Sequence, residues 1–444
     1  MPVTTPQPTA TVPRRNGILG RARSLARRFP SGRLFTLLLS VASLATATRT
    51  LPAQEPGSNL RISVITIGPG AQVWERFGHN AIMLEDTRTG QAVWYNYGMF
   101  DFGAKDFWPR FVKGDMRYWT AAREARLELD MYLRANRTVW RQELDLSPAE
   151  RLEVKRFLEW NVLPENRYYH YDYYRDNCST RVRDVIDRVI GGRIEALTHT
   201  VPAGTTFRRE TRRLTRSSLL WYTGIELGLG RPADRPISRY EEMFLPLALH
   251  RYLTDITREN PDGSTRPLVK AEETLYLSTA GPPPAGPPGW WPWFLIAGLG
   301  LGGVLLGSGR ALDRSGGARL TFGLLGCVWG LIAGVGGLGL AGLWAFTHHV
   351  ASYANENLLQ LSPLALPLAA LVWLVVRRPD QPHRITARLA LAVALCSVAG
   401  LLVKLLPGTS QVNWEIIAFA LPVNAGLALG LFAPRKRMPH PEGA

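Results

Sequence analysis

The hydropathy of the chain changes at about residue 290, and this change constrains the fold more than any other feature. Before it the sequence is charged and aromatic, whereas after it Leu, Ala and Gly dominate and charges are few. A helix needs about 20 apolar residues to cross the hydrocarbon core of a membrane. We therefore predict an integral membrane protein with an all-α bundle of about five transmembrane helices, at approximately residues 291–306, 320–346, 361–376, 389–406 and 414–432.

Basic residues are distributed unevenly among the connections between these spans. The first loop, the third loop and the tail at 434–444 carry Arg and Lys, whereas the second loop, between Phe346 and Leu361, has neither. Basic connections stay in the cytoplasm. This asymmetry predicts a cytoplasmic basic tail at 434–444 and places everything before Trp291 outside.

The N-terminus resembles an export signal. An Arg-rich stretch at 14–33 precedes a short apolar run at 34–45, and small residues follow at 45–47. The run is too short to span a bilayer comfortably, so residues 1–53 are predicted to be a signal peptide or an uncleaved N-terminal anchor. Either form exports the following chain, in agreement with the loop charges. We expect a multi-pass protein of a bacterial cytoplasmic (inner) membrane.

The formal net charge of +16 is also typical of proteins that bind nucleic acid. Many of the Arg residues flank hydrophobic spans, where membrane orientation accounts for them, and no RNA- or DNA-binding motif occurs. We therefore predict the lipid bilayer as a partner and no nucleic acid.

Residues 54–280 are predicted to form an extracytoplasmic α+β domain, joined to the membrane domain at 291–433 by a Pro-rich linker at 281–290. Alternating and β-branched segments indicate strands, and a Ser-Pro-Ala-Glu start and helical apolar spacing indicate helices. The expected strands are 61–67, 81–85, 92–97, 127–133 and 138–144, and the expected helices are 148–160, 178–191 and 210–216.

Cys178 is the candidate nucleophile. Cys327 and Cys396 fall inside apolar spans, whereas Cys178 is the one cysteine of the exported half and begins a predicted helix. A helix N-terminus stabilises a thiolate, and its free N–H groups can receive an oxyanion. A nucleophilic thiol also needs a base, for which His79, just before a strand, is the best candidate and His170 the second. The alternative interpretation is that Cys178 is a small buried hydrophobe, that His79 is a strand-end histidine satisfied by the backbone, and that His170 packs within its Tyr-rich segment.

No HExxH or CxxC motif occurs, and we expect neither a metal nor a cofactor. The outer loop between the second and third spans is polar and includes His348, His349, Asn355 and Asn357. Such a loop can be an ordinary solvated turn. It can also hold a lipid headgroup or an acceptor, since it lies where the exported domain should dock.

Several spaced motifs resemble one family. They are Trp74-x-x-Phe77-Gly78-His79-Asn80, Tyr95-Asn96-Tyr97-Gly98-x-Phe100-Asp101-Phe102, Gly114-x-x-x-Tyr118, Asn177-Cys178-Ser179-Thr180-Arg181 and an outer-loop pattern from His349 to Pro363. Together they resemble the DUF4105 domain, the periplasmic domain of Lnb-type lipoprotein N-acyltransferases. The order His-then-Cys, with Cys opening a helix, is also similar to circularly permuted NlpC/P60 (papain-like) folds.

The resemblance implies a Cys-His acyl-transfer enzyme, with these roles carried over onto Cys178 and His79. It leaves the orienting and oxyanion groups open, and the candidates are Asn80, Asn96, Tyr171 and Ser179. Arg181 and the four polar residues of the outer loop are candidates for substrate binding.

The function expected from this resemblance is transfer of a fatty acyl chain from a membrane phospholipid to the N-terminal amine of a diacylated lipoprotein through a Cys178 thioester. A cysteine peptidase or amidase acting on cell-wall peptides is the first alternative. A non-catalytic envelope scaffold is the second, and it predicts that loss of the thiol changes nothing.

Overall fold

A computed structural model describes residues 54–432 of the chain except residues 261, 380 and 408–410. Residues from Glu55 onward form one compact unit. The predicted signal segment at 1–53 and the predicted cytoplasmic tail at 434–444 lie outside the described residues, so both stay predictions.

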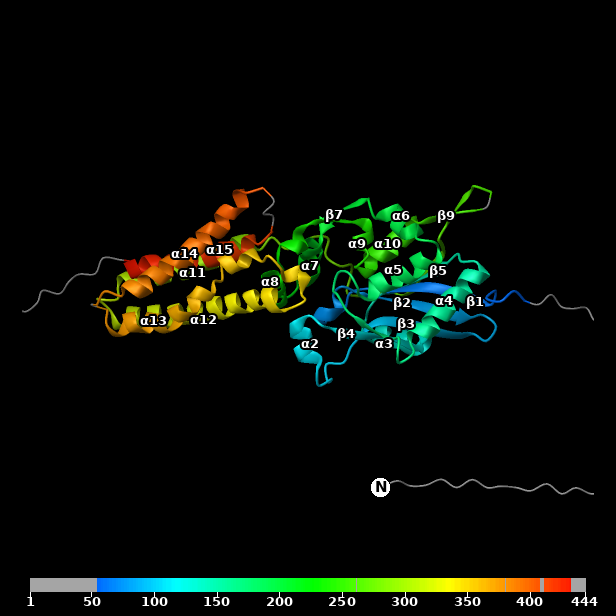
Figure 1. Ribbon diagram of the computed structural model, residues 1–444, viewed down its shortest axis with the longest axis horizontal. Helices are drawn as coiled ribbons and strands as arrows, with labels where there is room; N and C mark the ends of the chain where they lie inside the picture. The colour runs from blue at the N-terminus through cyan, green and yellow to red at the C-terminus, as the bar shows by residue number, and fades with distance from the viewer. Residues whose placement is uncertain (1–53, 261, 380, 408–410, 433–444) are drawn as a thin grey trace, which may run out of the picture. The chain divides into compact units, whose positions relative to one another are not determined.

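Residues 54–280, predicted to be exported and called the exported part below, contain a seven-stranded antiparallel sheet (Figure 1). Its strand order is β11-β5-β1-β2-β3-β4-β6. The strands are β1 (Leu60–Ile67), β2 (His79–Asp86), β3 (Gln91–Met99), β4 (Arg117–Glu124), β5 (Val139–Leu144), β6 (Tyr168–His170) and β11 (Val269–Tyr276). The alternation that predicted strands at 61–67, 81–85, 92–97 and 138–144 is confirmed.

Side chains of β1 enter two different hydrophobic clusters, because the sheet is covered on both faces. Ile62 and Val64 pack with helices α4 (Pro148–Asn161) and α5 (Cys178–Val189). Ile65 and Ile67 pack with Trp94 and Tyr132 on the opposite face. Burial on both faces makes β1 the centre of the domain and fixes its register.

The segment 127–133, expected to be extended, is instead part of helix α3 (Ala125–Arg134). Apolar residues at every second position suggested a strand, but Leu127 and Met131 are exposed, at 66% and 46%. Leu129 and Tyr132, three residues apart, pack onto the sheet. The surface ion pair between Arg134 and Asp130, 2.8 Å long, has the spacing of one helical turn.

The predicted helices are confirmed. The helix expected at 148–160 is α4 (Pro148–Asn161), where the Ser147 hydroxyl accepts the Glu150 N–H at 3.3 Å and the Glu150 carboxylate accepts the Ser147 N–H at 2.7 Å. The others are α5 (Cys178–Val189) and α7 (Phe207–Thr215).

Further short elements complete the exported part. They are η1 (Val73–Glu75), α2 (Phe107–Lys113), α6 (Arg193–Thr198), β7 (Pro202–Thr206), α8 (Leu219–Gly228), η2 (Arg231–Asp234), β8 (Pro236–Ser238), α9 (Arg239–Glu242), α10 (Pro246–Asp255), β9 (Thr257–Glu259) and β10 (Thr265–Pro267).

Among the described residues, four helices are long and apolar enough to cross a membrane, namely α11 (Trp291–Arg310), α12 (Gly316–Phe346), α14 (Arg384–Leu402, extended by η6 at Val403–Leu405) and α15 (Trp414–Phe432). The third predicted span, at 361–376, corresponds to the second part of a bent pair of helical stretches. A short helical stretch at Val350–Leu359 and a second at Pro363–Arg377, which includes α13 (Leu366–Arg377), meet at a bend of 48°. Pro363 has no N–H and cannot continue the first stretch. The prediction of about five spans holds if this pair counts as one.

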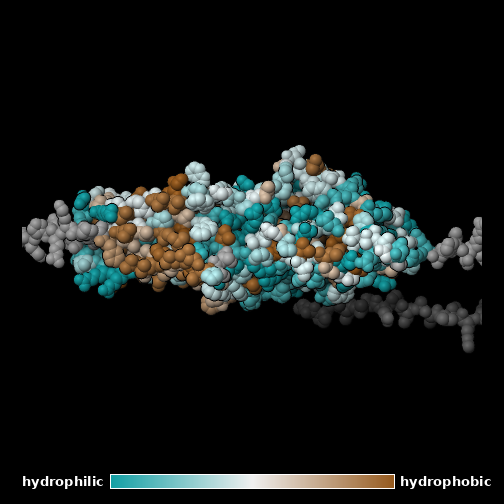
Figure 2. Space-filling model, turned by 90° about the horizontal axis from the view of Figure 1, so that it is seen from above, coloured by the Kyte–Doolittle hydropathy of each residue, from teal (hydrophilic) through white to brown (hydrophobic). Residues whose placement is uncertain are grey.

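Exposed apolar residues gather on the membrane helices, as Figure 2 shows on the face it presents. Ile296, Leu299, Val328 and Ile332 are each more than half exposed, at 60%, 57%, 52% and 54%. A water-soluble protein rarely leaves so much continuous apolar surface uncovered, whereas lipid covers it in a membrane.

Glycines let the membrane helices approach backbone to backbone. A Cβ atom built on Gly426 of α15 would lie 2.1 Å from the carbonyl oxygen of Gly302 on α11, and one on Gly334 of α12 would lie 2.5 Å from Leu366 N. Small residues therefore set the spacing of these helices.

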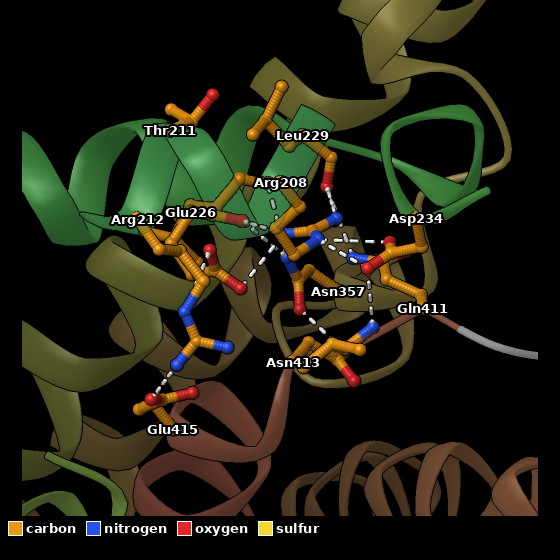
Figure 3. A network of polar contacts seen from close by, with 12 residues as sticks. Arg208, Thr211, Arg212, Glu226, Leu229, Asp234, Asn357, Gln411, Asn413 and Glu415 are labelled. Carbon is orange, nitrogen blue, oxygen red and sulfur yellow. Dashed lines mark hydrogen bonds and ion pairs between the residues drawn. The ribbon is translucent and has the colours of Figure 1, made fainter. Parts of the chain in front are cut away.

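A buried network of charges joins the exported part to the start of α15 (Figure 3). Arg208 on α7 is 1% exposed and binds the carboxylates of Glu226 at 2.8 Å and Asp234 at 2.9 Å. One turn further along α7, Arg212 pairs with Glu415 at the beginning of α15. Because a buried charge needs a partner, this network ties the two parts together.

We predict that Gly426→Ala destabilises the protein by about 1–3 kcal/mol, since the added methyl group must force α11 and α15 apart. Gly303→Ala is the control, because nothing lies within 4 Å of a Cβ at Gly303. Thermal unfolding of the purified protein in detergent checks this. Equal melting temperatures for the two variants would contradict the close packing of these helices.

Candidate active site

Cys178 is the first residue of α5, and its backbone is held by a buried cap. The Asn177 side-chain oxygen accepts the N–H groups of Ser179 at 2.9 Å and Thr180 at 3.0 Å. The Asn177 amide in turn donates to the carbonyl oxygens of Tyr173 and Phe244, both at 2.9 Å. A cap bonded on both sides fixes where the thiol points, and it explains why Asn precedes Cys in the sequence.

Backbone N–H groups surround the thiol. Those of Asn80, Ser179 and Cys178 itself favour the thiolate, as does the charge of Arg137, but burial is the larger effect and raises the pKa of Cys178. Burial therefore outweighs the stabilisation of the thiolate that the helix N-terminus was expected to provide. The resting thiol is neutral at pH 7.

Gly98 on β3 makes room for this thiol. Its φ is +80°, and a Cβ built there would lie 3.5 Å from Cys178 Cβ and 3.3 Å from Tyr171 Cε2. A side chain at this position would need an unfavourable backbone conformation and a small shift of Tyr171.

His79 is the first residue of β2, next to the Asn80 N–H that faces the thiol. Its Nε2 lies 3.0 Å from the side-chain oxygen of Asn96 on β3. If Nε2–H donates to this oxygen, Nδ1 keeps its lone pair and is free to accept a proton. Burial lowers the pKa of His79 to about 4, partly opposed by the Asn96 bond, so the imidazole is neutral at pH 7.

The four candidates for an orienting or oxyanion group are now distinguished by their contacts. Asn96 bonds His79, whereas the Asn80 side chain donates to Thr66 Oγ1 at 2.8 Å on the neighbouring strand. The Ser179 hydroxyl donates to the Met243 carbonyl at 2.6 Å, and the Tyr171 ring stacks on Tyr118 with centroids 4.4 Å apart. Asn80 therefore contributes to the site through its backbone N–H, and the ring of Tyr171 lines the site.

Arg137 is a site residue that the sequence does not reveal. It is 5% exposed, donates through Nε to the Gly68 carbonyl at 2.9 Å, and lies over the Tyr132 ring at 5.2 Å. Its charge favours both the thiolate of Cys178 and the neutral form of His79. Its Nη2 atom is buried and has no hydrogen-bond partner among the described residues. Nothing distinguishes it in sequence from the many other arginines.

The remaining predicted residues lie elsewhere. Arg181 is paired with Asp176 and lies 4.1 Å over the Tyr169 ring, beside a separate cavity of about 380 Å³. His170 is 81% exposed and bonds Asp115 at 2.9 Å. Within the described residues, no three His, Cys, Asp or Glu side chains gather as metal ligands would.

The polar outer loop packs against the exported domain. His349 Nε2 lies 2.8 Å from the Phe111 carbonyl oxygen, and the His348 N–H donates to the Lys113 carbonyl at 2.8 Å. The amides of Asn355 and Asn357 donate to the Leu227 carbonyl at 2.8 and 3.1 Å, at the end of α8. Through these contacts the four residues hold the loop against the exported domain. Their role in substrate binding stays a prediction.

We predict that alkylation of Cys178 by iodoacetamide has a pH midpoint above the ordinary thiol value of 9.0, because burial disfavours the reactive thiolate. The experiment uses a protein in which Cys327 and Cys396 are replaced by Ala and follows the rate by mass spectrometry. Denaturation should return the midpoint to the ordinary value. Rapid alkylation at pH 7, with a midpoint below 8.5, would contradict a buried neutral thiol.

Comparison with protein families matches residues 48–213, which include Cys178, His79 and Asn96, to the Lnb N-terminal periplasmic domain. Comparison with curated proteins and with solved structures gave no match. The resemblance to the Lnb-type family is thereby confirmed, while the likeness to NlpC/P60 folds stays a prediction. Residues 48–213 therefore match the Lnb N-terminal periplasmic domain, and the chain that carries them continues into several helices long and apolar enough to cross a membrane.

Proposed function

We propose that this protein is a thiol-dependent acyltransferase, which moves an acyl chain from a membrane phospholipid to the N-terminal amine of a diacylated lipoprotein. One observation carries the proposal. Cys178 opens a capped helix with its thiol facing the N–H of Asn80, and the adjacent residue His79 is neutral and bonded to Asn96, all within the matched domain. Such a set can support nucleophilic catalysis by a thiol.

In the first step the Cys178 sulfur attacks the ester carbonyl carbon of the phospholipid while His79 accepts the thiol proton. Because both groups rest in their neutral forms, the proton moves as the sulfur attacks rather than beforehand. The tetrahedral oxyanion is stabilised by the N–H groups of Cys178 and Asn80, and the Arg137 charge contributes. The C–O bond then breaks, His79 returns its proton to the departing lysophospholipid oxygen, and a thioester remains.

In the second step the α-amine of the lipoprotein's diacylglyceryl-cysteine attacks the thioester carbonyl carbon. His79 accepts a proton from the attacking nitrogen, and the C–S bond breaks. The sulfur recovers this proton, so the product is an amide and the enzyme is unchanged. Ester, thioester and amide follow one another without any need for a nucleotide or a metal.

The membrane part favours lipid substrates over the alternatives. Cell-wall peptides are soluble, so a peptidase or amidase would use the helices only as an anchor. The packing of the exported domain on the outer loop through His349, Asn355 and Asn357 supports a domain held at the lipid surface. A scaffold would require no thiol at all.

The acyl-enzyme is the direct test of this proposal. We expect full-length protein incubated with phospholipid alone to gain the mass of one acyl chain on Cys178, removable by hydroxylamine. Cys178→Ala should gain none, and His79→Ala should acylate about 10²- to 10⁴-fold more slowly. Cys327→Ala is the matched control and should behave as wild type. Failure of wild type to acylate, though folded in membranes, would overturn the first step.

Asn96 offers a second test through pH. A carboxylate in Asn96→Asp should raise the pKa of His79 from about 4, because a negative charge favours imidazolium. The neutral imidazole needed as base is then lost at higher pH, so acylation at pH 5 should fall severalfold relative to pH 8. In the wild type His79 is already neutral at both pH values, so its protonation should change the rate of acylation much less between pH 5 and pH 8. An unchanged profile in the variant would exclude His79 as the base.

A further inference from the structure

A cavity of about 560 Å³ lies where α11, α14 and α15 meet α7 and the linker. This volume falls within the range of about 300–1,000 Å³ typical of small-molecule sites. The residues that matter for its chemistry are Arg212, Trp291, Leu295, Trp414, Glu415 and Leu421. None of them belongs to the site around Cys178.

Most of the cavity wall is apolar and comes from membrane helices. Leu295 lies on α11 and Leu421 on α15, so the apolar wall is continuous with helices that face lipid. Trp291 and Trp414 open these two helices and are 51% and 47% exposed. Tryptophan at the end of a membrane helix is typical of the boundary between hydrocarbon and headgroups. A hydrocarbon chain can therefore enter this cavity from the bilayer.

The polar end of the cavity contains an incompletely bonded carboxylate. Glu415 is 2% exposed, and its Oε1 accepts from Arg212 and from the Tyr222 hydroxyl, the latter at 3.1 Å (Figure 3 shows the Arg212 bond). Its other oxygen, Oε2, is buried and has no hydrogen-bond partner among the described residues. A buried carboxylate oxygen without a donor is costly, so a ligand whose N–H group reaches it when the Glu415 side chain turns toward the cavity would be favoured.

We propose that this cavity binds a phospholipid with a primary ammonium headgroup, that is, a phosphatidylethanolamine. One acyl chain would lie along Leu295 and Leu421, and the ammonium group would donate to Glu415 Oε2. The neighbouring Arg212 guanidinium complements the lipid phosphate. A choline headgroup has the same charge but no N–H donor, so it cannot make the bond to Glu415.

The test uses delipidated full-length protein and equimolar phosphatidylethanolamine and phosphatidylcholine with identical acyl chains, and native mass spectrometry counts the bound lipids. Wild type should retain the ethanolamine lipid about tenfold more than the choline lipid, as a charge-assisted hydrogen bond allows. Glu415→Gln should abolish the preference. Equal retention of both lipids by wild type, or a preference that survives in Glu415→Gln, would overturn the proposal.

A second pair of variants keeps the test valid if Glu415→Gln does not fold. Leu421→Trp should fill the cavity and remove most binding of both lipids, whereas Leu429→Trp, at a position of α15 that is 55% exposed and outside the cavity, should not. Unchanged retention in a folded Leu421→Trp protein would also overturn the proposal. Cys178→Ala should bind as wild type, so this inference can fail or succeed independently of the acyl transfer.

Discussion

The buried charge of Arg208 is the interaction on which the arrangement of this protein depends. Its guanidinium is held between carboxylates of α8 and η2, and it also donates to the backbone carbonyls of Leu229 and Gly230 at 2.9 and 3.1 Å. Loss of one partner from such a buried set costs about 3–5 kcal/mol, because the remaining charge stays out of water. Arg208 thus fixes α7, α8 and the segment after them as one block.

Both functional regions are attached to this block. On one side, the Thr211 hydroxyl of α7 lies 2.9 Å from the Tyr174 hydroxyl, four residues before Cys178. On the other, the end of α8 receives the outer-loop asparagines, and Arg212 reaches Glu415 at the start of α15. The contacts therefore run from the thiol segment to the membrane helices, which suits the proposed transfer between substrates in the bilayer.

Local patterns predicted much of this structure, and the failures concern contacts between distant segments. Cys178 was expected at a helix start because its neighbours form a cap, and that cap is local. Asn96 could not be chosen over Asn80 or Tyr171, because its contact with His79 depends on the pairing of β2 with β3, where Ala81 stands opposite Asn96. Arg137, just before β5, and Tyr132, in α3, were missed because they come close to His79 only in the folded sheet, where the Tyr132 ring stacks on His79 with centroids 6.4 Å apart. The misassigned segment at 127–133 has strand-like alternation, but Leu127 and Met131 face solvent while Leu129 packs onto the sheet, which only tertiary packing reveals.

The proposed acyl transfer to lipoproteins depends on the thiol of Cys178. Mass spectrometry of lipoprotein N-termini tests this dependence in cells that lack a native N-acyltransferase and express either this protein or its Cys178→Ala form. We expect a third acyl chain on the α-amine only when Cys178 is present. N-termini that stay diacylated, although the wild-type protein is folded and in the membrane, would contradict it.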